Sequence, residues 1–380
     1  MKNWRYIEEH NVSASYGLGV DEFLMDQNVK SRTNPISLRL YTYKNYSALS
    51  GRFQDISAEI DIEKCRSEGF GYSRRLTGGG AIIMGEKQLG ICLAAPSSAF
   101  EWKHIRELYE LFSKPIIQTL QELGIDASFR SKNDLEVGSK KIAGLGVYLS
   151  PEGNIQFHTS LLLDMDIPAM MSVLKIPIQK YSDKKKINSV SQRLTTISKE
   201  LNREVSIQEV VSLIRKNFSL QFGIALFEES LSRSEKSQVE KIEKDRYLND
   251  DWIFQNSPQA DMTGMSLKKT SAGLLRTYIG LKGNTIKSVL ITGDFFEQSE
   301  LLNQIETALK WSPLDKGKIE QVVREVFERN VVENCGMKQE DIVTNIWRAG
   351  QRAMIGEKYT YNGSCYYPKE KTKEVNQEVV

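Results

Sequence analysis

Residues 73–83 of this 380-residue chain read Ser-Arg-Arg-Leu-Thr-Gly-Gly-Gly-Ala-Ile-Ile. Three consecutive glycines exclude a regular helix or a well-paired strand, because each adds backbone entropy that folding must overcome. A folded chain keeps such a run where its backbone bends with positive φ or lies close to a ligand. Arg74 and Arg75 beside exposed backbone N–H groups predict a site for an anion such as phosphate or carboxylate. The spacing fits neither the Walker loop nor the dinucleotide fingerprint, so a hairpin turn with a solvated arginine pair stays open.

A second stretch, residues 132–144, favours the first of these interpretations. It reads Lys-Asn-Asp-Leu-Glu-Val-Gly-Ser-Lys-Lys-Ile-Ala-Gly. This pattern predicts a strand, a tight turn at Gly138-Ser139 and a second strand beginning at Lys141. Such a hairpin would hold Lys141 beside two small residues, where a ligand can approach the backbone. From the residues alone, the two stretches predict an anion or nucleotide site with a candidate lysine.

Taken together, the two motifs resemble those of the lipoate–protein ligase A family. They are Arg-Arg-x-Thr-Gly-Gly-Gly-Ala at 74–81, then Asn-Asp-Leu at 133–135 and Lys-Ile-Ala-Gly at 141–144. The resemblance continues to a Gly-Asp-Phe-Phe at 293–296 and covers roughly residues 4–330. It implies an α/β fold, with a mixed, largely antiparallel sheet flanked by helices and a small C-terminal α/β domain. We expect a catalytic domain at 1–246, an accessory domain at 247–333, and a helix plus a charged, disordered tail at 334–380.

The family's roles transfer to the residues that match its motifs. Lys141 would be the catalytic residue, contacting the acyl carbonyl and the α-phosphate, while Arg75 would bind phosphate or the acyl carbonyl. Asp134 and Asn133 would hold Lys141 or a magnesium ion. The adenylate would lie against the backbone of the glycine loop and of the residues after it: Gly78, Gly79, Gly80, Ala81, Ile82 and Ile83.

Two weaker matches point to the acyl side of the site. Gly-Arg-Phe-Gln at 51–54 resembles the family's Gly-Arg-x-Gln and implies that Arg52 and Gln54 bind substrate, although a solvated Arg52 is an equal alternative. His158 lies in a segment similar to the family's His-His-Gly-Thr-Leu-Leu, so it is either a substrate-binding residue or a core histidine. After Ile83 the family's His-Asp pair is missing, which puts a side-chain contact from that position in doubt.

Hydrophobic periodicity predicts the elements around these motifs. Alternation indicates strands at 36–43 and 155–164, and apolar faces indicate helices at 101–123 and 207–222. Pro115 within 101–123 predicts either a kink or a boundary between two helices. A short helix is expected at 61–69, ending at a glycine. The polar run at 230–251 is typical of a solvated helix or a linker, and the basic run within 181–195 is either a solvated loop or a cover for the nucleotide.

Composition excludes several classes of protein. Hydrophobic residues make up 40% and charged residues 26%, as in an ordinary globular protein. The net charge of +2 is too small to indicate nucleic acid or a membrane surface as the main partner. No apolar run approaches the roughly 20 residues that span a bilayer, and the N-terminus lacks a secretory pattern. The four cysteines are widely spaced, so we expect no zinc site or disulfide framework and a reducing cytoplasm. We also expect a monomer.

The resemblance also implies a reaction. The family activates lipoate with ATP to lipoyl-adenylate and transfers the acyl group to a lysine of a carrier domain, which needs positive charge at the carboxylate and the α-phosphate. It implies ATP, Mg²⁺ and lipoate as cofactors and substrate, with octanoate as an alternative acid. The implied partner is a lipoyl carrier protein, of the type of a 2-oxoacid dehydrogenase E2 lipoyl domain or a glycine-cleavage H protein.

Two other functions remain open at this stage. Relatives of the same fold transfer octanoyl groups without ATP through a cysteine thioester, and they place that cysteine just before the lysine hairpin. Residues 129–134 of this chain contain no cysteine, and Cys65 and Cys92 read as small buried hydrophobic residues. The second alternative is a non-catalytic module that binds an acyl group or a nucleotide, which the altered segment after Ile83 keeps open.

Overall fold

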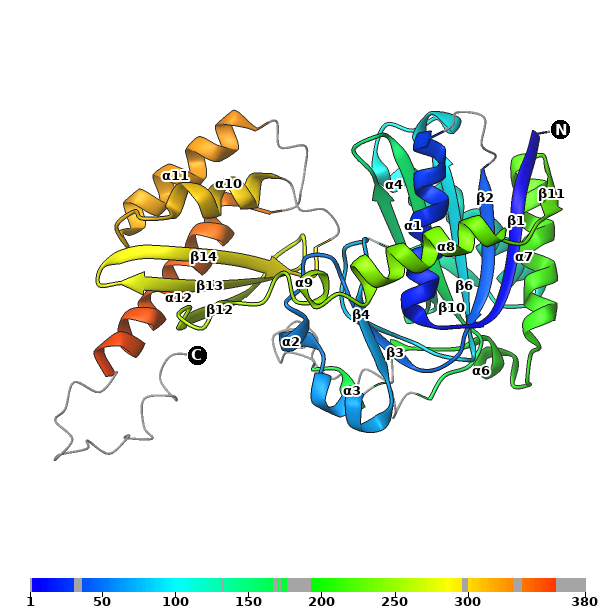
Figure 1. Ribbon diagram of the computed structural model, residues 1–380, viewed down its shortest axis with the longest axis horizontal. Helices are drawn as coiled ribbons and strands as arrows, with labels where there is room; N and C mark the ends of the chain where they lie inside the picture. The colour runs from blue at the N-terminus through cyan, green and yellow to red at the C-terminus, as the bar shows by residue number, and fades with distance from the viewer. Residues whose placement is uncertain are drawn as a thin grey trace. The chain divides into compact units, whose positions relative to one another are not determined.

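The chain forms two units in a computed structural model, which describes residues 2–30, 36–130, 133–166, 170, 172–175, 193–295, 300–330 and 337–359 (Figure 1). The first unit comprises residues 1–257 together with 272–274 and 292–298. The second comprises 258–271, 275–291 and 299–380. The domain limits expected from the sequence stay a prediction.

The first unit is built on a mixed sheet that has eight strands among the described residues. β1 pairs in parallel with β11 and with β2, whereas every pair from β2 across to β7 is antiparallel. This arrangement confirms the predicted α/β class with a largely antiparallel sheet. In spatial order the strands are β11 (Ile224–Glu228), β1 (Lys2–Val12), β2 (Ser37–Tyr43), β6 (Gln88–Pro96), β10 (Asn154–Leu162), β9 (Lys140–Leu149), β8 (Asp134–Val137) and β7 (Ala127–Arg130).

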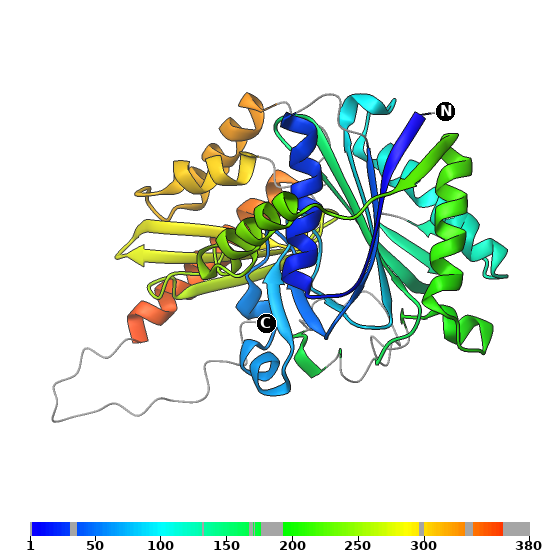
Figure 2. The same ribbon diagram turned by 45° about the vertical axis from the view of Figure 1, so that its right-hand side comes forward.

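Helices cover both faces of this sheet, and Figure 2 shows α1 and α7 on opposite sides of it. One face packs against α4 (Ile105–Glu122) and α7 (Ile207–Phe222) in the larger core. The other face packs against α1 (Ala14–Lys30) and α8 (Arg233–Ile242). Because strand side chains alternate between faces, each strand contributes to both layers. On β9 the residues of the larger core are Ile142, Ala143, Leu145 and Val147.

The α4 face holds an aromatic cluster around Phe112. Its ring centroid lies 5.0 Å from that of Phe100 and 5.3 Å from that of Phe157 on β10. The sequence predicts a buried face for this helix, and the structure confirms it. α4 continues through Pro115 as a single helix, so the alternative of two separate helices is wrong.

A smaller three-stranded sheet carries the glycine run between two of its strands. β3 (Ser47–Ser50) pairs in parallel with β4 (Gly71–Arg74) and antiparallel with β5 (Ile82–Met84). Between β3 and β4 lie α2 (Ile56–Glu59) and α3 (Ile62–Glu68), whose N-caps are aspartates. α3 ends at Gly69 with φ +73°, as the sequence predicts for a helix that ends at a glycine.

The polar run at 230–251 forms a helix with one buried face. α8 starts with a capping box at Ser232 and Glu235 and continues into a π-helical turn, η4 (Glu243–Tyr247). Val239 and Tyr247 are fully buried against the α1 layer. The Tyr247 hydroxyl donates a hydrogen bond of 2.7 Å to Glu22 on α1. The run is therefore a packed element of the first unit and is solvated on one side only.

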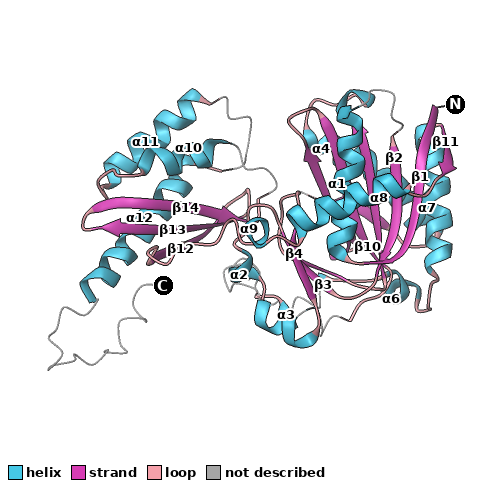
Figure 3. Cartoon of the chain, in the orientation of Figure 1, coloured by secondary structure: helices cyan, strands magenta, loops and turns pink. Residues whose placement is uncertain are grey.

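The second unit combines a three-stranded sheet with helices (Figure 3). α12 approaches β12 so closely that a Cβ on Gly264 would lie 2.1 Å from the Ala349 carbonyl oxygen. The helix predicted within residues 334–380 is present as α12. The elements of this unit are β12 (Gly264–Lys269), β13 (Leu274–Lys282), β14 (Thr285–Gly293), α10 (Glu300–Leu309), α11 (Lys316–Arg329) and α12 (Gln339–Tyr359), except that Leu274 and residues 292–293, at the ends of β13 and β14, group with the first unit. Among the described residues, no helix has the length and apolar character needed to cross a membrane.

We expect Phe112→Ala to lower the free energy of unfolding by about 3–5 kcal/mol, because it removes a buried ring and leaves a cavity among other rings. Urea unfolding measures this loss. The control is Leu220→Ala on α7, where the side chain is 68% exposed and the expected change is within about 0.5 kcal/mol. Equal losses in the two variants would contradict the assigned core.

Candidate functional site

Lys141 is presented by an irregularity in the β8–β9 hairpin. Leu135 pairs with Ala143 and Glu136 with Lys141, so Ile142 is an extra residue on β9, as in a β-bulge. The bulge lets Ile142 and Ala143 both enter the core while Lys141 remains on the opposite face. The hairpin turn occurs at Gly138, with φ +61°, as the sequence predicts. A bulge beside a strand turn is a common device for aiming a functional side chain.

The Lys141 side chain lies over Gly144 and forms an ion pair with Asp134. Its Nζ is 2.8 Å from Asp134 Oδ1, and the two side chains are 30% and 31% exposed. A Cβ on Gly144 would lie 2.7 Å from the same Nζ, so a side chain at this position would displace the end of the lysine. The ammonium is therefore held in place and remains accessible to a ligand.

Asn133 and Thr195 both form hydrogen bonds with β9, the strand that carries Lys141. The Asn133 side-chain amide donates to the Leu145 carbonyl oxygen at 2.8 Å, and Leu145 N–H donates back to Asn133 O at 2.8 Å. Thr195 N–H donates to the Lys141 carbonyl oxygen at 2.9 Å. Thr195 was not predicted as a site residue. The basic loop expected to cover the nucleotide lies largely outside the described residues.

Arg75 points into the protein and holds the glycine loop, which we define as residues 75–81. Its guanidinium donates to the carbonyl oxygens of Gly78 at 2.9 Å and Gly80 at 2.7 Å, and also to Leu49 O and Thr77 Oγ1. The side chain is 4% exposed, and burial lowers its pKa to about 10. Four of the five N–H groups of Arg75 therefore bind the protein itself. Contact of Arg75 with phosphate or an acyl carbonyl stays a prediction.

The glycine loop directs its backbone donors away from Arg75. In a trans peptide the N–H points opposite to the C=O of the same unit. Gly78 C=O and Gly80 C=O point to Arg75, so the N–H groups of Gly79 and Ala81 point away from it. Gly79, with φ +93°, donates to the Phe295 carbonyl oxygen at 2.9 Å. Ala81 N–H donates to no described residue, which leaves a backbone donor for a ligand.

Ile82 and Ile83 belong to β5, where they pair with Leu49 and Ala48 of β3. Ile83 is 3% exposed and its carbonyl oxygen accepts from Gln88 at 3.2 Å. Contact of their backbone with an adenylate stays a prediction.

Thr77 connects the glycine loop to His158 on β10. Thr77 Oγ1 and His158 Nε2 share a hydrogen bond of 3.0 Å, and a Cβ on Gly146 would lie 2.4 Å from the same nitrogen. Burial, and then the charge of Arg75, lower the pKa of His158 to about 3. The imidazole is therefore neutral at pH 7. Thr77 is a second residue that the sequence reasoning did not select.

Arg52 and Gln54 lie in the turn beside the glycine loop. The Arg52 guanidinium lies 5.0 Å from the ring centroid of Tyr148 on β9, and no described carboxylate forms an ion pair with it. Gln54 is 1% exposed; its Oε1 accepts from Gly51 N–H at 2.9 Å, and its Nε2 has no described partner. Gly51 must be a glycine, since a Cβ there would lie 2.0 Å from the Gly79 carbonyl oxygen.

Arg74, which the sequence predicts to bind an anion together with Arg75, instead fixes that turn from inside the protein. Both arginines are buried, so the alternative of a solvated arginine pair is wrong. The Arg74 guanidinium is fully buried, and burial lowers its pKa to about 10. Every hydrogen bond that it donates ends on a backbone carbonyl oxygen. The acceptors are Gly51, Arg52, Gln54, Trp252 and Ile253, at 2.6 to 3.0 Å.

The two motifs meet on one face of the main sheet. On β9 the residues that point away from the larger core include Lys141, Gly144, Gly146 and Tyr148, and His158 lies opposite Gly146 on β10. Thr77 brings the glycine loop to this face through His158, and Arg52 reaches it over Tyr148. The structure thus places an accessible lysine, a neutral histidine and an unpaired arginine around a surface lined by glycines.

Neither described cysteine has an accessible thiol. Cys92 lies opposite His158 on β6, but it is completely buried and hydrogen-bonded to Asp21, and burial raises the pKa of its thiol well above the ordinary value. Cys65 is also buried, and burial raises its pKa to about 11. Both thiols are protonated at pH 7 and behave as small core residues.

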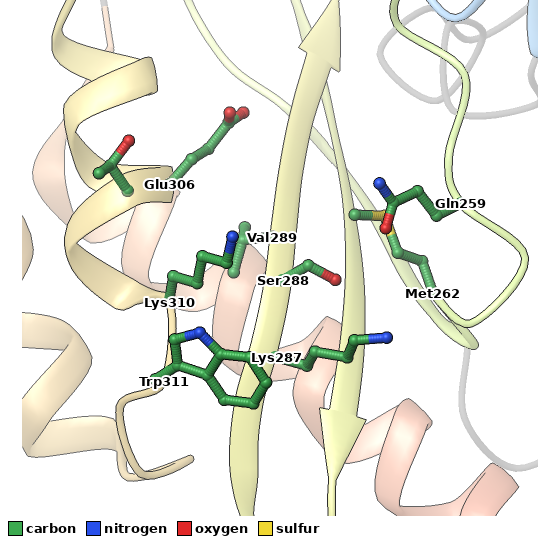
Figure 4. A pocket seen from close by; sticks show the side chains of 9 residues that line it. Gln259, Met262, Lys287, Ser288, Val289, Glu306, Lys310 and Trp311 are labelled. Carbon is green, nitrogen blue, oxygen red and sulfur yellow. The ribbon is translucent and has the colours of Figure 1, made fainter.

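A separate hollow of about 330 Å³ lies in the second unit and contains none of the predicted site residues (Figure 4). Burial raises the pKa of Glu306, at its edge, to about 7, and Ile291 N–H donates to this carboxyl at 2.6 Å. Lys287, which also lines the hollow, is paired with Asp261. Its lysines and its carboxyl group favour no single class of ligand.

The chain matches known families over most of its length. The model of the lipoyl protein ligase A/B catalytic domain matches residues 13–219, and that of the bacterial lipoate protein ligase C-terminus matches residues 261–346. The lipoate-protein ligase LplJ of Bacillus subtilis is 26% identical over 324 residues, which cover 84% of this chain and 94% of that protein. The octanoyltransferase LipM of Brevibacillus brevis is 26% identical over 275 residues, which cover 66% of this chain and 99% of that protein.

A solved structure shares the fold. A bi-partite lipoate protein ligase from Thermoplasma acidophilum, studied with its E2 lipoyl domain, superimposes with a TM-score of 0.59 at 23% identity. The match covers 68% of this chain and 99% of that chain.

His158 gives the site a pH-dependent signature. With a folded pKa of about 3 and an ordinary value of 6.5, the unfolded chain binds a proton in this interval that the folded protein does not. The contribution of His158 to the free energy of unfolding is therefore fully present above pH 6.5. It decreases as the pH falls, by at most about 1.4 kcal/mol per pH unit. We expect His158→Gln to lose less stability than the unsubstituted protein when urea unfolding is compared at pH 7 and pH 5.5. Identical losses would contradict a neutral imidazole at this position.

Proposed function

The chain belongs to the family of the lipoyl protein ligase A/B catalytic domain, and on that premise we propose that it is an ATP-dependent, AMP-forming lipoate–protein ligase. The match confirms the resemblance found in the sequence and makes the protein an enzyme of the lipoate ligase and octanoyltransferase class. In the proposed reaction, lipoate or octanoate is activated to an acyl-adenylate and transferred to a lysine of a carrier protein. The observation that carries the proposal is the accessible Lys141 ammonium, held by Asp134 on the face where the glycine loop and His158 meet.

The proposed chemistry has two balanced steps. A carboxylate oxygen of the acid attacks the α-phosphorus of ATP, and pyrophosphate leaves. The amine of the carrier lysine then attacks the acyl carbonyl, AMP leaves as the C–O bond breaks, and the amine loses a proton. Both steps gather negative charge on phosphoryl or carbonyl oxygens, so a preorganised cation is the main requirement. Lys141 supplies that cation, with the position of its ammonium set by Asp134 and Gly144.

Arg52 provides a second positive charge for the proposed anions. Its guanidinium is stacked near Tyr148 and is not neutralised by a described carboxylate. A planar guanidinium can bind a carboxylate or a phosphate with two parallel hydrogen bonds. The Ala81 N–H, which donates to no described residue, is a further donor. Together with the Lys141 ammonium, these groups fit the phosphates of a nucleotide and the carboxylate of an acid.

Magnesium also fits the proposed reaction. Mg²⁺ in nucleotide enzymes is held mostly by phosphates and water, with one or two carboxylates from the protein. Asp134 would supply that carboxylate beside Lys141. When bound, the ion would neutralise charge on the phosphates. Among the described residues, no group of three potential metal-ligating side chains exists to form a site of its own.

The buried cysteines favour a ligase over a transferase that works through a thioester. Such a transferase needs a thiolate that the acyl carbonyl can reach. Cys65 and Cys92 are both completely buried, with raised thiol pKa values. Lys141 and the glycine loop need no thiol for adenylate chemistry.

We propose a lipoyl carrier domain as the protein partner. The Thermoplasma acidophilum ligase was studied with an E2 lipoyl domain, and that ligase shares the fold of this chain. An E2 lipoyl domain or a carrier of the H-protein type would supply the acceptor lysine. Incubation of each carrier with ATP and octanoate, followed by mass spectrometry of the acceptor lysine, distinguishes between them.

We expect Lys141→Ala to lower the rate of ATP–pyrophosphate exchange with lipoate or octanoate by about 10²–10³-fold, the scale for losing one preorganised donor. The exchange assay contains no carrier, so it measures the activation step alone. Lys140→Ala is the matched control, because Lys140 is the neighbouring lysine on the same strand and lies outside the ion pair.

Exchange at the normal rate in Lys141→Ala would remove Lys141 from the activation step. Absence of exchange in the folded, unsubstituted protein, together with ATP-independent transfer of octanoate between carriers, would replace the ligase with the octanoyltransferase.

A further inference from the structure

The glycine loop is held from outside by a segment that is distant in the sequence. Residues 293–295, Gly-Asp-Phe, group with the first unit, although they lie in the region matched by the C-terminal family model. The Phe295 carbonyl oxygen accepts from Gly79 N–H at 2.9 Å, and Gly293 N–H donates to the Phe53 carbonyl oxygen at 3.0 Å. One short segment therefore bonds the glycine loop and the adjacent turn at 51–54 at the same time.

Side chains reinforce these backbone bonds. The rings of Phe53 and Phe295 are stacked, with centroids 6.0 Å apart and an interplanar angle of 29°. Phe295 is 1% exposed. A Cβ on Gly293 would lie 2.2 Å from the Phe295 ring, so the glycine gives the ring room to reach Phe53.

The segment is itself fixed by a turn. Asp294 Oδ1 accepts from Leu274 N–H at 2.5 Å, and Asp294 N–H donates to the Leu274 carbonyl oxygen at 3.4 Å. A Cβ on Gly273 would lie 2.5 Å from Asp294 Oδ1. The position of the Phe295 carbonyl is therefore set by a hydrogen-bonded turn and by the aromatic stack.

We infer that Phe295 is a positioning residue for the nucleotide-binding loop: its carbonyl oxygen holds Gly79 N–H and its ring holds Phe53. This inference rests on the proposed function. Arg75 draws the loop carbonyls inward, and Phe295 anchors the same peptide from the other side. With both ends of the Gly78–Gly79 peptide bonded, the donors of the residues that follow keep a fixed direction toward ATP. A loop without the outer anchor would bind ATP weakly and would still accept the acid.

The test uses Phe295→Ala in the full chain, with two readouts. In the protein without ligand, hydrogen–deuterium exchange of a peptide covering residues 75–81 should become about tenfold faster, the scale of one lost hydrogen bond. In ATP–pyrophosphate exchange, the KM for ATP should rise about tenfold, while the KM for lipoate stays within about twofold. Phe295→Leu, which keeps an apolar side chain against Phe53, should recover most of both effects.

Phe100→Ala is the matched control. Phe100 is a partly buried ring of the first unit that packs against Trp4, Phe112 and Phe222. It should lower stability and leave both the exchange of residues 75–81 and the KM for ATP unchanged. If Phe295→Ala is unfolded by circular dichroism, Phe53→Ala removes the other ring of the stack and provides the same two readouts.

The outcomes separate this inference from the proposed function. No exchange activity in the unsubstituted protein overturns the proposed function, and with it this inference. Normal activity in the unsubstituted protein, with an unchanged KM for ATP or unchanged deuterium uptake in Phe295→Ala, or in Phe53→Ala where Phe295→Ala is unfolded, overturns the role of Phe295 alone. An equal rise of both KM values would also overturn it, because it would show general loosening of the site.

Discussion

Two adjacent buried guanidiniums organise the candidate site, and neither of them donates a hydrogen bond to a described carboxylate. Arg74 donates only to backbone carbonyl oxygens, and Arg75 donates to three carbonyls and the Thr77 hydroxyl. Removing a cation from water is costly unless its donors are satisfied. Guanidinium has five N–H groups in a fixed plane, so it can satisfy several carbonyls at once where lysine cannot. The carbonyls are thereby fixed in turn, and the loop becomes rigid from within.

That rigidity has a direct electrostatic consequence. Each bonded carbonyl forces the N–H of the same peptide to point the opposite way. Inward carbonyls at Gly78 and Gly80 therefore produce outward donors at Gly79 and Ala81, without any side chain in the loop. Burial, and then the charge of Arg75, lower the pKa of His158, so the candidate site combines a neutral imidazole with a nearby positive charge. An anion gains from the field while the histidine remains unprotonated.

The local part of this design could be predicted from sequence. Alternation and turn residues predict β2, β10 and the β8–β9 hairpin, because strand pattern and the φ +61° turn at Gly138 depend on neighbouring residues. The family motifs led to Lys141 and Asp134, which the structure pairs. The inward direction of the Arg75 side chain could not be predicted, because the neighbouring residues in the sequence are equally compatible with an exposed arginine. The β-bulge at Ile142 was also missed, because it depends on which residues can enter the core.

Residues that act through distant partners were harder still to find. Arg74 forms hydrogen bonds with Trp252 and Ile253. Thr77 forms one with His158, and Gly79 forms one with Phe295. In each pair the two residues are far apart in the sequence. No periodicity or spacing connects such pairs in one sequence. A run of glycines does indicate that neighbouring groups must approach closely. It does not indicate which groups these are.

Sequence identity does not settle the choice between ligase and transferase, because LplJ and LipM are each 26% identical to this chain. Cys92 is the described thiol nearest to His158 in the strand register, so it is the natural candidate for an acyl carrier. Its hydrogen-bond partner Asp21 also accepts from Arg39 at 2.7 Å and from Tyr41 at 3.0 Å, and all of these side chains are buried. Exposing the thiol would break this network and leave a buried charge without its partners, at a cost of several kcal/mol. Activation through ATP requires no such rearrangement, since the Lys141 ammonium is already held and accessible.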